Sequence, residues 1–183
     1  MRRATLILAA IAVALAGVVV GVQAPPAQAH DHLVPQTVLK KGARELQTGR
    51  RVVESSWSHP AGDNECVQES AIYTVGFREA DRVSVGSELR VRIFKKQRPD
   101  AFEVTAYKRV DQNGHPAGDG RPLATSLKPV VEDGRRVAWD AVFHVNRPDR
   151  DYYLITEGHW QDRQGCGGDQ YAYWSFHVMT GGS

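Results

Sequence analysis

The sequence lacks the short motifs that most enzymes and metalloproteins carry. It has only two cysteines and two methionines, too few for a zinc site of clustered thiolates or for a methionine-rich copper loop. It contains no Gly-x-Ser-x-Gly elbow, His-Glu-x-x-His pair, phosphate-binding loop or dinucleotide glycine fingerprint. These absences favour a binding protein over an enzyme, although a catalytic group assembled only in space would leave no such pattern.

An excess of charge of one sign is also missing. The formal net charge is +2 at pH 7, and Arg2 and Arg3 at the amino terminus account for it. A near-neutral chain gives no general reason to expect nucleic acid or an anionic membrane as a partner. No stretch of ten residues has a clear 3.6-residue period, and there is no internal repeat. The chain is therefore expected to be built from strands.

The first 29 residues have the pattern of a cleaved secretion signal. Arg2 and Arg3 precede a nearly unbroken apolar run over 4–22, and the segment closes on Ala27-Gln28-Ala29. We predict a signal peptide over 1–29, an N-terminal extension that is partly disordered over 30–48, and one domain over 49–183. After cleavage the protein is expected to be secreted, monomeric and free of the membrane.

Two cysteines without a Cys-x-x-Cys spacing predict one disulfide in an exported chain. Cys66 and Cys166 both lie in polar sequence typical of turns. A bond between them would enclose residues 67–165, which is most of the domain. It is expected to tie two loops together at one end of the fold.

Alternating polar and apolar residues predict seven to nine short antiparallel strands. The expected strands cover 51–57, 68–77, 87–95, 102–110, 123–131, 136–145, 151–160 and 171–179. Tight turns are expected at Asp111–Gly114 and Glu132–Gly134, and Pro129 marks an edge strand. The segment Leu33–Leu46 is ambiguous and could hold a helical turn. The pattern is typical of an all-β sandwich.

From Val85 onward the layout resembles immunoglobulin-like and fibronectin-like sandwiches. The most specific element is Asp151-Tyr152-Tyr153-Leu154-Ile155, which is similar to the start of their penultimate strand. That resemblance implies a tyrosine hydrogen bond back to the preceding turn, and Trp139 as a central buried aromatic. The cysteines do not match the buried bond of antibody domains, and the resemblance implies no activity.

Cleavage after Ala29 would create the amino terminus His30-Asp31-His32. Its amine, two backbone amides and the His32 imidazole could enclose Cu(II) or Ni(II) in a square plane. A variant, in which His30 itself binds copper with His144 or His115, resembles secreted copper monooxygenases that act on polysaccharides and periplasmic copper carriers. A polar tail without a ligand is the alternative.

Two further groups of residues are candidate ligand-binding sites. Polar side chains of the two cysteine-bearing segments could bind a metal or another ligand; they are His59, Asp63, Glu65, His159, Asp162 and Asp169. Tyr171 and Tyr173 alternate with core positions and could form an exposed strip that stacks on sugars or meets a protein. The alternative for the first group is that these polar side chains are simply solvated loop residues. The alternative for the two tyrosines is ordinary packing between neighbouring strands.

We therefore expect a secreted, disulfide-stabilised β-sandwich that binds an extracellular protein or polysaccharide. The alternatives are extracellular Cu(II) or Ni(II) binding, and a carbohydrate-binding module or carbohydrate-active copper enzyme.

Overall fold

The computed structural model describes residues 34–46, 51–60, 65–72, 77, 80–112, 114–148, 150–162 and 165–181. They form twelve strands and no helix, which confirms the all-β prediction. The predicted number of seven to nine strands was too low, because it left out short strands such as Arg44–Glu45 and Arg121–Pro122. Nothing in this described part is a helix that could reach across a bilayer. The predicted signal peptide over 1–29 lies outside the described residues.

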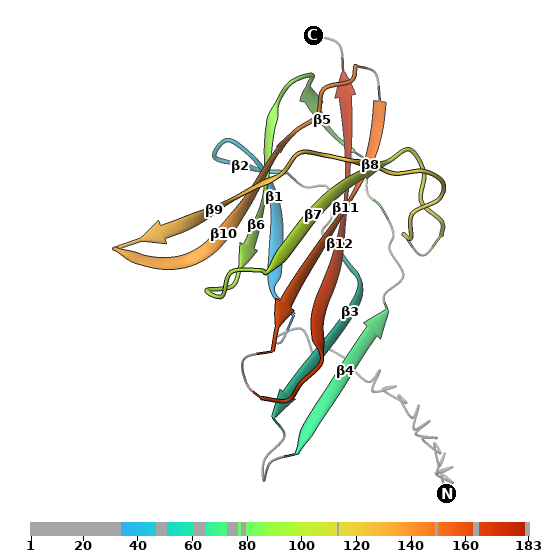
Figure 1. The fold of residues 1–183 in the computed structure, drawn as a ribbon. Helices are drawn as coiled ribbons and strands as arrows, with labels where there is room; N and C mark the ends of the chain where they lie inside the picture. The colour runs from blue at the N-terminus through green and yellow to red at the C-terminus, as the bar shows by residue number, and fades with distance from the viewer. Residues whose placement is uncertain are drawn as a thin grey trace, which may run out of the picture.

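The strands form two sheets, stacked as a sandwich (Figure 1). The five-stranded sheet has the order β2 (Arg44–Glu45), β1 (Gln36–Lys41), β6 (Glu88–Phe94), β10 (Arg135–His144) and β9 (Ser126–Glu132). All of its pairings are antiparallel. The β9–β10 hairpin projects from the side of the molecule (Figure 1). The predicted turn at Glu132–Gly134 is present, and its two central residues, Asp133 and Gly134, both have positive φ.

The larger sheet carries the longest strands. Its order is β4 (Cys66–Ile72), β3 (Arg51–Pro60), β12 (Asp169–Gly181), β11 (Arg150–Gln161), β7 (Ala101–Tyr107) and β8 (Arg121–Pro122). A seventh strand, β5 (Asp81–Ser84), pairs with the end of β12. This pair is parallel, so the prediction of antiparallel strands alone was wrong at this point.

Alternation along the strands sends apolar side chains between the sheets, because successive residues of a strand face opposite sides. On β12 the buried set is Ala172, Trp174, Phe176 and Val178, the face that the sequence assigned to the core. They meet Leu89, Val91 and Ile93 of β6, which are also fully buried, in one cluster. Trp139 belongs to this core, but Trp160 and Trp174 are its largest fully buried side chains.

The ambiguous segment Leu33–Leu46 contains strands rather than a helical turn. β1 pairs with β6, and a hairpin through Gly42 leads into β2. Leu39 and Leu46 are 1% and 5% exposed. This stretch therefore packs into the core although it precedes residue 49, where we place the start of the sandwich domain.

Tyr152 makes the hydrogen bond that the resemblance implied. Its side chain is buried, and its hydroxyl donates to the carbonyl of Arg147, 3.4 Å away in the preceding turn. The bond fixes the chain where it enters β11.

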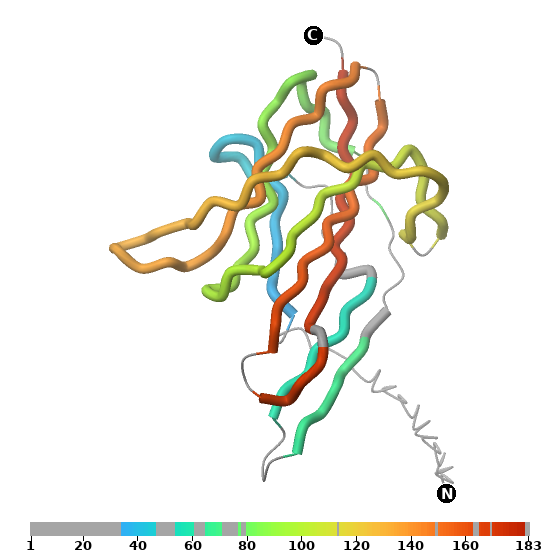
Figure 2. The backbone as a smooth tube through the Cα atoms, in the orientation of Figure 1, coloured from blue at the N-terminus to red at the C-terminus, as the bar shows by residue number. Residues whose placement is uncertain are grey.

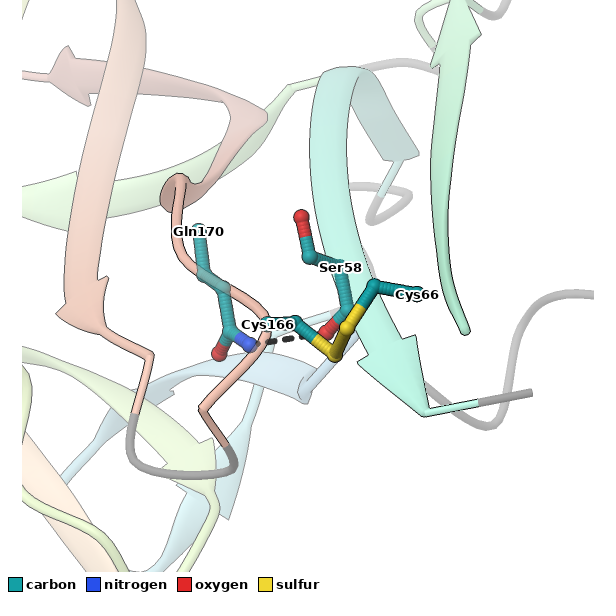
Figure 3. Close-up of a disulfide and its surroundings, with 4 residues drawn as sticks. All are labelled: Ser58, Cys66, Cys166 and Gln170. Atoms are coloured by element: carbon teal, nitrogen blue, oxygen red, sulfur yellow. Dashed lines mark hydrogen bonds between the residues drawn. A yellow bond between two sulfur atoms is a disulfide. The ribbon is translucent and has the colours of Figure 1, made fainter. Parts of the chain in front are cut away.

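Cys66 and Cys166 form the predicted disulfide, with their Cα atoms 5.4 Å apart (Figure 3). Beside it, the Gln170 amide donates to the carbonyl of Ser58 at 2.9 Å. The prediction of two loops needs one correction: Cys166 lies in the β11–β12 connection, but Cys66 is the first residue of β4. The bond indicates an oxidising compartment outside the cytoplasm.

Candidate functional site

A row of polar side chains crosses the outer face of the larger sheet. In register, Glu54 of β3 lies opposite Tyr173 of β12, Tyr173 opposite Glu157 of β11, and Glu157 opposite Glu103 of β7. Four neighbouring strands thus contribute three carboxylates and one phenol. β11 and β12 run side by side along the middle of the molecule (Figure 2), which places this row near the centre of the face.

Two of the carboxylates are held by hydrogen bonds. The Tyr173 hydroxyl donates to Oε1 of Glu157 at 2.7 Å, and Nε2 of His159 lies 2.5 Å from the same oxygen. The Tyr171 hydroxyl donates to Oε1 of Glu54 at 3.0 Å. Because an ionised carboxylate only accepts, the proton on His159 must sit on Nε2. These hydrogen bonds hold the carboxylates of Glu54 and Glu157 in place before any ligand binds.

Both phenols are stabilised in their protonated form. Partial burial, followed by the hydrogen bond to Glu157 and its charge, raises the pKa of Tyr173. Partial burial and the bond to Glu54 likewise raise the pKa of Tyr171. The two hydroxyls therefore remain donors throughout the neutral range.

This shift predicts a loss of stability in alkali. The folded pKa of Tyr173 lies above the ordinary value of 10.0, so the folded state holds the proton more tightly. Its contribution is complete below about pH 10 and is lost as the pH rises through the folded pKa. Urea unfolding from about pH 8 to about pH 11 should show a shallower decline for Tyr173→Phe than for the wild type. Equal declines would contradict the assignment, and Tyr107→Phe is the matched control.

The row forms the floor of a pocket, here called the acidic pocket. It encloses about 130 Å³, close to the roughly 150 Å³ of a cavity that admits benzene. The lining residues come from four strands and one connection: Glu54, Glu103, Thr105, Tyr107, Ile155, Glu157, Tyr173 and the segment 114–116. No lysine or arginine is among these residues.

The wall of the acidic pocket comes from residues 114–116 of the β7–β8 connection. This connection stands out beside the strands of the larger sheet (Figure 2). Its predicted turn is present, since the amide of Gly114 donates to the carbonyl of Asp111 at 3.0 Å. Gly120 packs against the sheet so closely that an added Cβ would lie 2.4 Å from the Tyr107 ring. A glycine at this point lets the connection lie flat on Thr105 and Tyr107.

Glu103 is the unusual member of the row. Its exposed carboxylate has no hydrogen-bond or ion-pair partner within the described ranges, and it lies directly opposite Glu157. Like charges placed directly opposite on neighbouring strands are destabilising. The pair thus carries an electrostatic cost that a bound cation would remove.

The structure brings some of the predicted site residues together and separates others. Tyr171 and Tyr173 share the outer face with His159, whose ring lies 6.0 Å from that of Tyr171. The two tyrosine rings meet edge to face, 76° apart, so they do not form one flat stacking surface. His59 lies on β3, where its Nε2 is 3.9 Å from Glu69. It does not join the tyrosine face.

Of the remaining predicted ligands, Glu65 is exposed just before β4 and Asp162 is half-buried just after β11. The others are not placed. Asp63, His30 and His32 lie outside the described residues, and the side chain of Asp169 is not described either. The N-terminal Cu(II) or Ni(II) site therefore stays a prediction. Among the residues that are described, no three His, Cys, Asp or Glu side chains are grouped as metal ligands.

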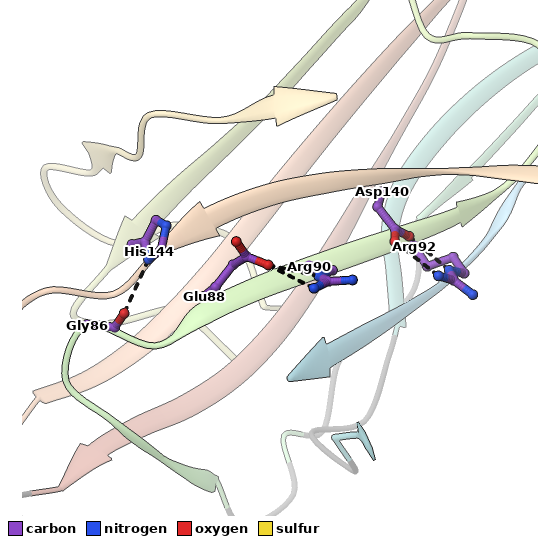
Figure 4. A network of polar contacts seen from close by, with 6 residues as sticks. All are labelled: Gly86, Glu88, Arg90, Arg92, Asp140 and His144. Atoms are coloured by element: carbon purple, nitrogen blue, oxygen red, sulfur yellow. Dashed lines mark hydrogen bonds and ion pairs between the residues drawn. The ribbon is translucent and has the colours of Figure 1, made fainter. Parts of the chain in front are cut away.

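The outer face of the five-stranded sheet has the opposite character. Arg90 and Arg92 of β6 point outward, paired with Glu88 and Asp140 (Figure 4). Arg92 binds both oxygens of Asp140, at 2.8 and 3.0 Å, and this bond raises the pKa of the guanidinium. These arginines are thus satisfied within the sheet.

No sequence pattern singles out Glu54, Glu103 and Glu157 as a group. Alternation along the expected strand 102–110 places Glu103, Thr105 and Tyr107 on one polar face of that strand, and this is the only sequence signal for the site. Which residues lie beside them depends on the order and register of four strands, which a single sequence does not specify.

The chain was compared with protein-family models, with curated proteins and with solved structures. None of the three comparisons found a match.

Proposed function

We propose that the protein is a secreted binding protein whose acidic pocket holds an organic cation, an alkylammonium or guanidinium group. The observation that carries this proposal is the unpartnered Glu103 opposite Glu157, in a pocket whose lining holds no lysine or arginine. The histidine of the lining, His115, lies 3.4 Å from the carboxylate of Asp111. A cation between the two carboxylates would replace their repulsion with two attractions. Secretion is supported by the leader pattern of 1–29 and by the disulfide.

The neighbouring aromatics suit the same ligand. Tyr107 and Tyr173 line the pocket, and tyrosine rings attract ammonium and guanidinium groups through their π faces. The hydroxyl of Tyr173 is already donated to Glu157, so Tyr173 contributes its ring and holds the acceptor in place. Because Tyr173 and the Glu157 carboxylate are already held in position, less conformational entropy is lost when a ligand binds.

A neutral sugar suits the pocket less well. Hydroxyl groups could donate to the carboxylates, but a neutral ligand would leave the repulsion between Glu103 and Glu157 unrelieved. The edge-to-face arrangement of Tyr171 and Tyr173 also gives no flat surface for a pyranose ring.

Calorimetric titration at low salt with butylammonium, guanidinium and methyl glucoside tests the proposal. We expect saturable binding of a cation and none of the sugar. Glu157→Gln and Glu103→Gln should each weaken cation binding about tenfold or more, because a charge-assisted contact contributes about 1.5–3 kcal/mol. Salt should weaken binding in the wild type.

The matched control is Glu88→Gln, which makes the same charge change on the other sheet. It should leave the affinity unchanged. Equal weakening by Glu88→Gln and Glu157→Gln would mean that only the overall charge matters. Binding of the sugar without the cations would replace the proposal with carbohydrate recognition.

A further inference from the structure

A second pocket, here called the edge pocket, lies where the chain crosses from one sheet to the other between β8 and β9. It encloses about 180 Å³. Arg121 lines it from the start of β8, His144 from the end of β10, and Asn146 from the β10–β11 connection. No acidic residue is part of this lining, in contrast to the acidic pocket.

Arg121 is the main charge of the edge pocket. Its guanidinium has no carboxylate partner anywhere in the described ranges, and the Asn146 amide has no hydrogen-bond partner there. An arginine presents a planar fork of donors that matches the two oxygens of a carboxylate. The side-chain amide of Asn146 adds a further donor to the same pocket.

His144 is fixed in orientation beside these groups. Its Nδ1 lies 3.2 Å from the carbonyl oxygen of Gly86 (Figure 4). A carbonyl oxygen only accepts, so Nδ1 carries the proton and Nε2 is left for another partner. Glu88 lies opposite His144 in register, but Arg90 occupies that carboxylate through contacts of 2.9 and 3.0 Å. The neighbouring negative charge is thus already neutralised.

The rest of the edge pocket is apolar. Pro122, Leu123 and Ala124 form one side, and the ring of Tyr152 belongs to the lining. The Tyr152 hydroxyl donates to the carbonyl of Arg147. A ligand in the edge pocket would therefore contact the ring of Tyr152 and not its hydroxyl. A ligand that fits both parts has an anionic head and a short hydrophobic body.

We propose that the edge pocket binds a small organic carboxylate. The carboxylate lies on Arg121 with Asn146 beside it, and the hydrophobic body lies against Leu123 and Tyr152. This site is separate from the acidic pocket and does not depend on the function proposed for it.

Amide chemical shifts of the labelled secreted protein, recorded during titration with benzoate, test this site. Benzoate should shift the amide resonances of Arg121, Leu123, Ala124 and 144–146 along saturable curves. Acetate, which lacks the ring, and inorganic phosphate, which lacks any apolar body, should bind more weakly. Benzyl alcohol, which lacks the charge, should cause no saturable shift.

The variant Arg121→Gln should weaken benzoate binding about tenfold or more, as expected for loss of a charge-assisted pair. Arg135→Gln is the matched control, because it removes the same charge from an exposed position at the start of β10, beside the β9–β10 turn. Absence of saturable benzoate binding to the wild type would overturn the proposal. So would equal weakening by both variants, or phosphate binding as tightly as benzoate.

Discussion

Removing the Cys66–Cys166 disulfide is expected to lower the free energy of unfolding by about 4–5 kcal/mol. The two cysteines are 100 positions apart, and closing so long a loop strongly restricts the unfolded chain. Domains of this kind are stable by only about 5–15 kcal/mol in total. The oxidised protein should therefore keep its fold under conditions in which the reduced protein is partly unfolded.

Urea unfolding of the wild type and of the double variant Cys66→Ala/Cys166→Ala measures this loss. Cys66 is exposed, so replacing it with alanine removes little packing. A thiol reductant should shift the unfolding midpoint of the wild type to that of the double variant and leave the latter unchanged. Closely similar midpoints before and after reduction would show that the bond contributes little.

Trp160→Ala is expected to cost about 3–5 kcal/mol, the range for truncating a large buried aromatic side chain. Trp160 is 2% exposed. Its ring lies 5.4 Å from that of Trp57 and 6.1 Å from that of Trp174. The backbone is shaped for it: a Cβ added at Gly158 would lie 2.6 Å from the Trp160 ring. The cavity left by alanine would open in the middle of this cluster.

Trp160→Phe should be much milder. The Trp160 Nε1 is buried without a hydrogen-bond partner within the described ranges, and a buried unpaired donor costs about 1–3 kcal/mol. Phenylalanine removes that donor while it keeps most of the ring. Val131→Ala, at a side chain that is 58% exposed, should change stability by less than about 0.5 kcal/mol. If Phe proves as damaging as Ala at position 160, the unpaired nitrogen carries no cost.

Alternation of polar and apolar residues predicted the strands well where one face of a strand is buried and the other is exposed to solvent. It failed at β1, where the consecutive residues Thr37, Val38 and Leu39 are all buried. Val38 faces outward, in register with Arg92, so this strand is covered on both sides and loses its period-two pattern. Val142, an exception to the alternation of its strand, is buried on the same outer face.

The candidate site was predictable only in part, for a different physical reason. Period two places Tyr171 and Tyr173 on one face, but it cannot say what lies beside them. Glu157 and Glu103 become neighbours because β11 pairs with β7, and those strands are joined by more than forty residues of intervening chain. Pairings between distant segments are decided by the packing of the whole sandwich.

The location of the cross-link also constrains how a new molecule matures. A chain made from its amino end presents the thiol of Cys66 long before Cys166 exists, so the first thiol must wait while about a hundred further residues are added. No other cysteine is present, so mispairing within one chain is ruled out. The hazard that remains is attack by the waiting Cys66 thiolate on the Cys66–Cys166 bond of a finished second molecule, which forms a mixed disulfide between the two chains and releases one thiol of the second molecule. Crowded production should therefore yield covalent dimers linked through Cys66.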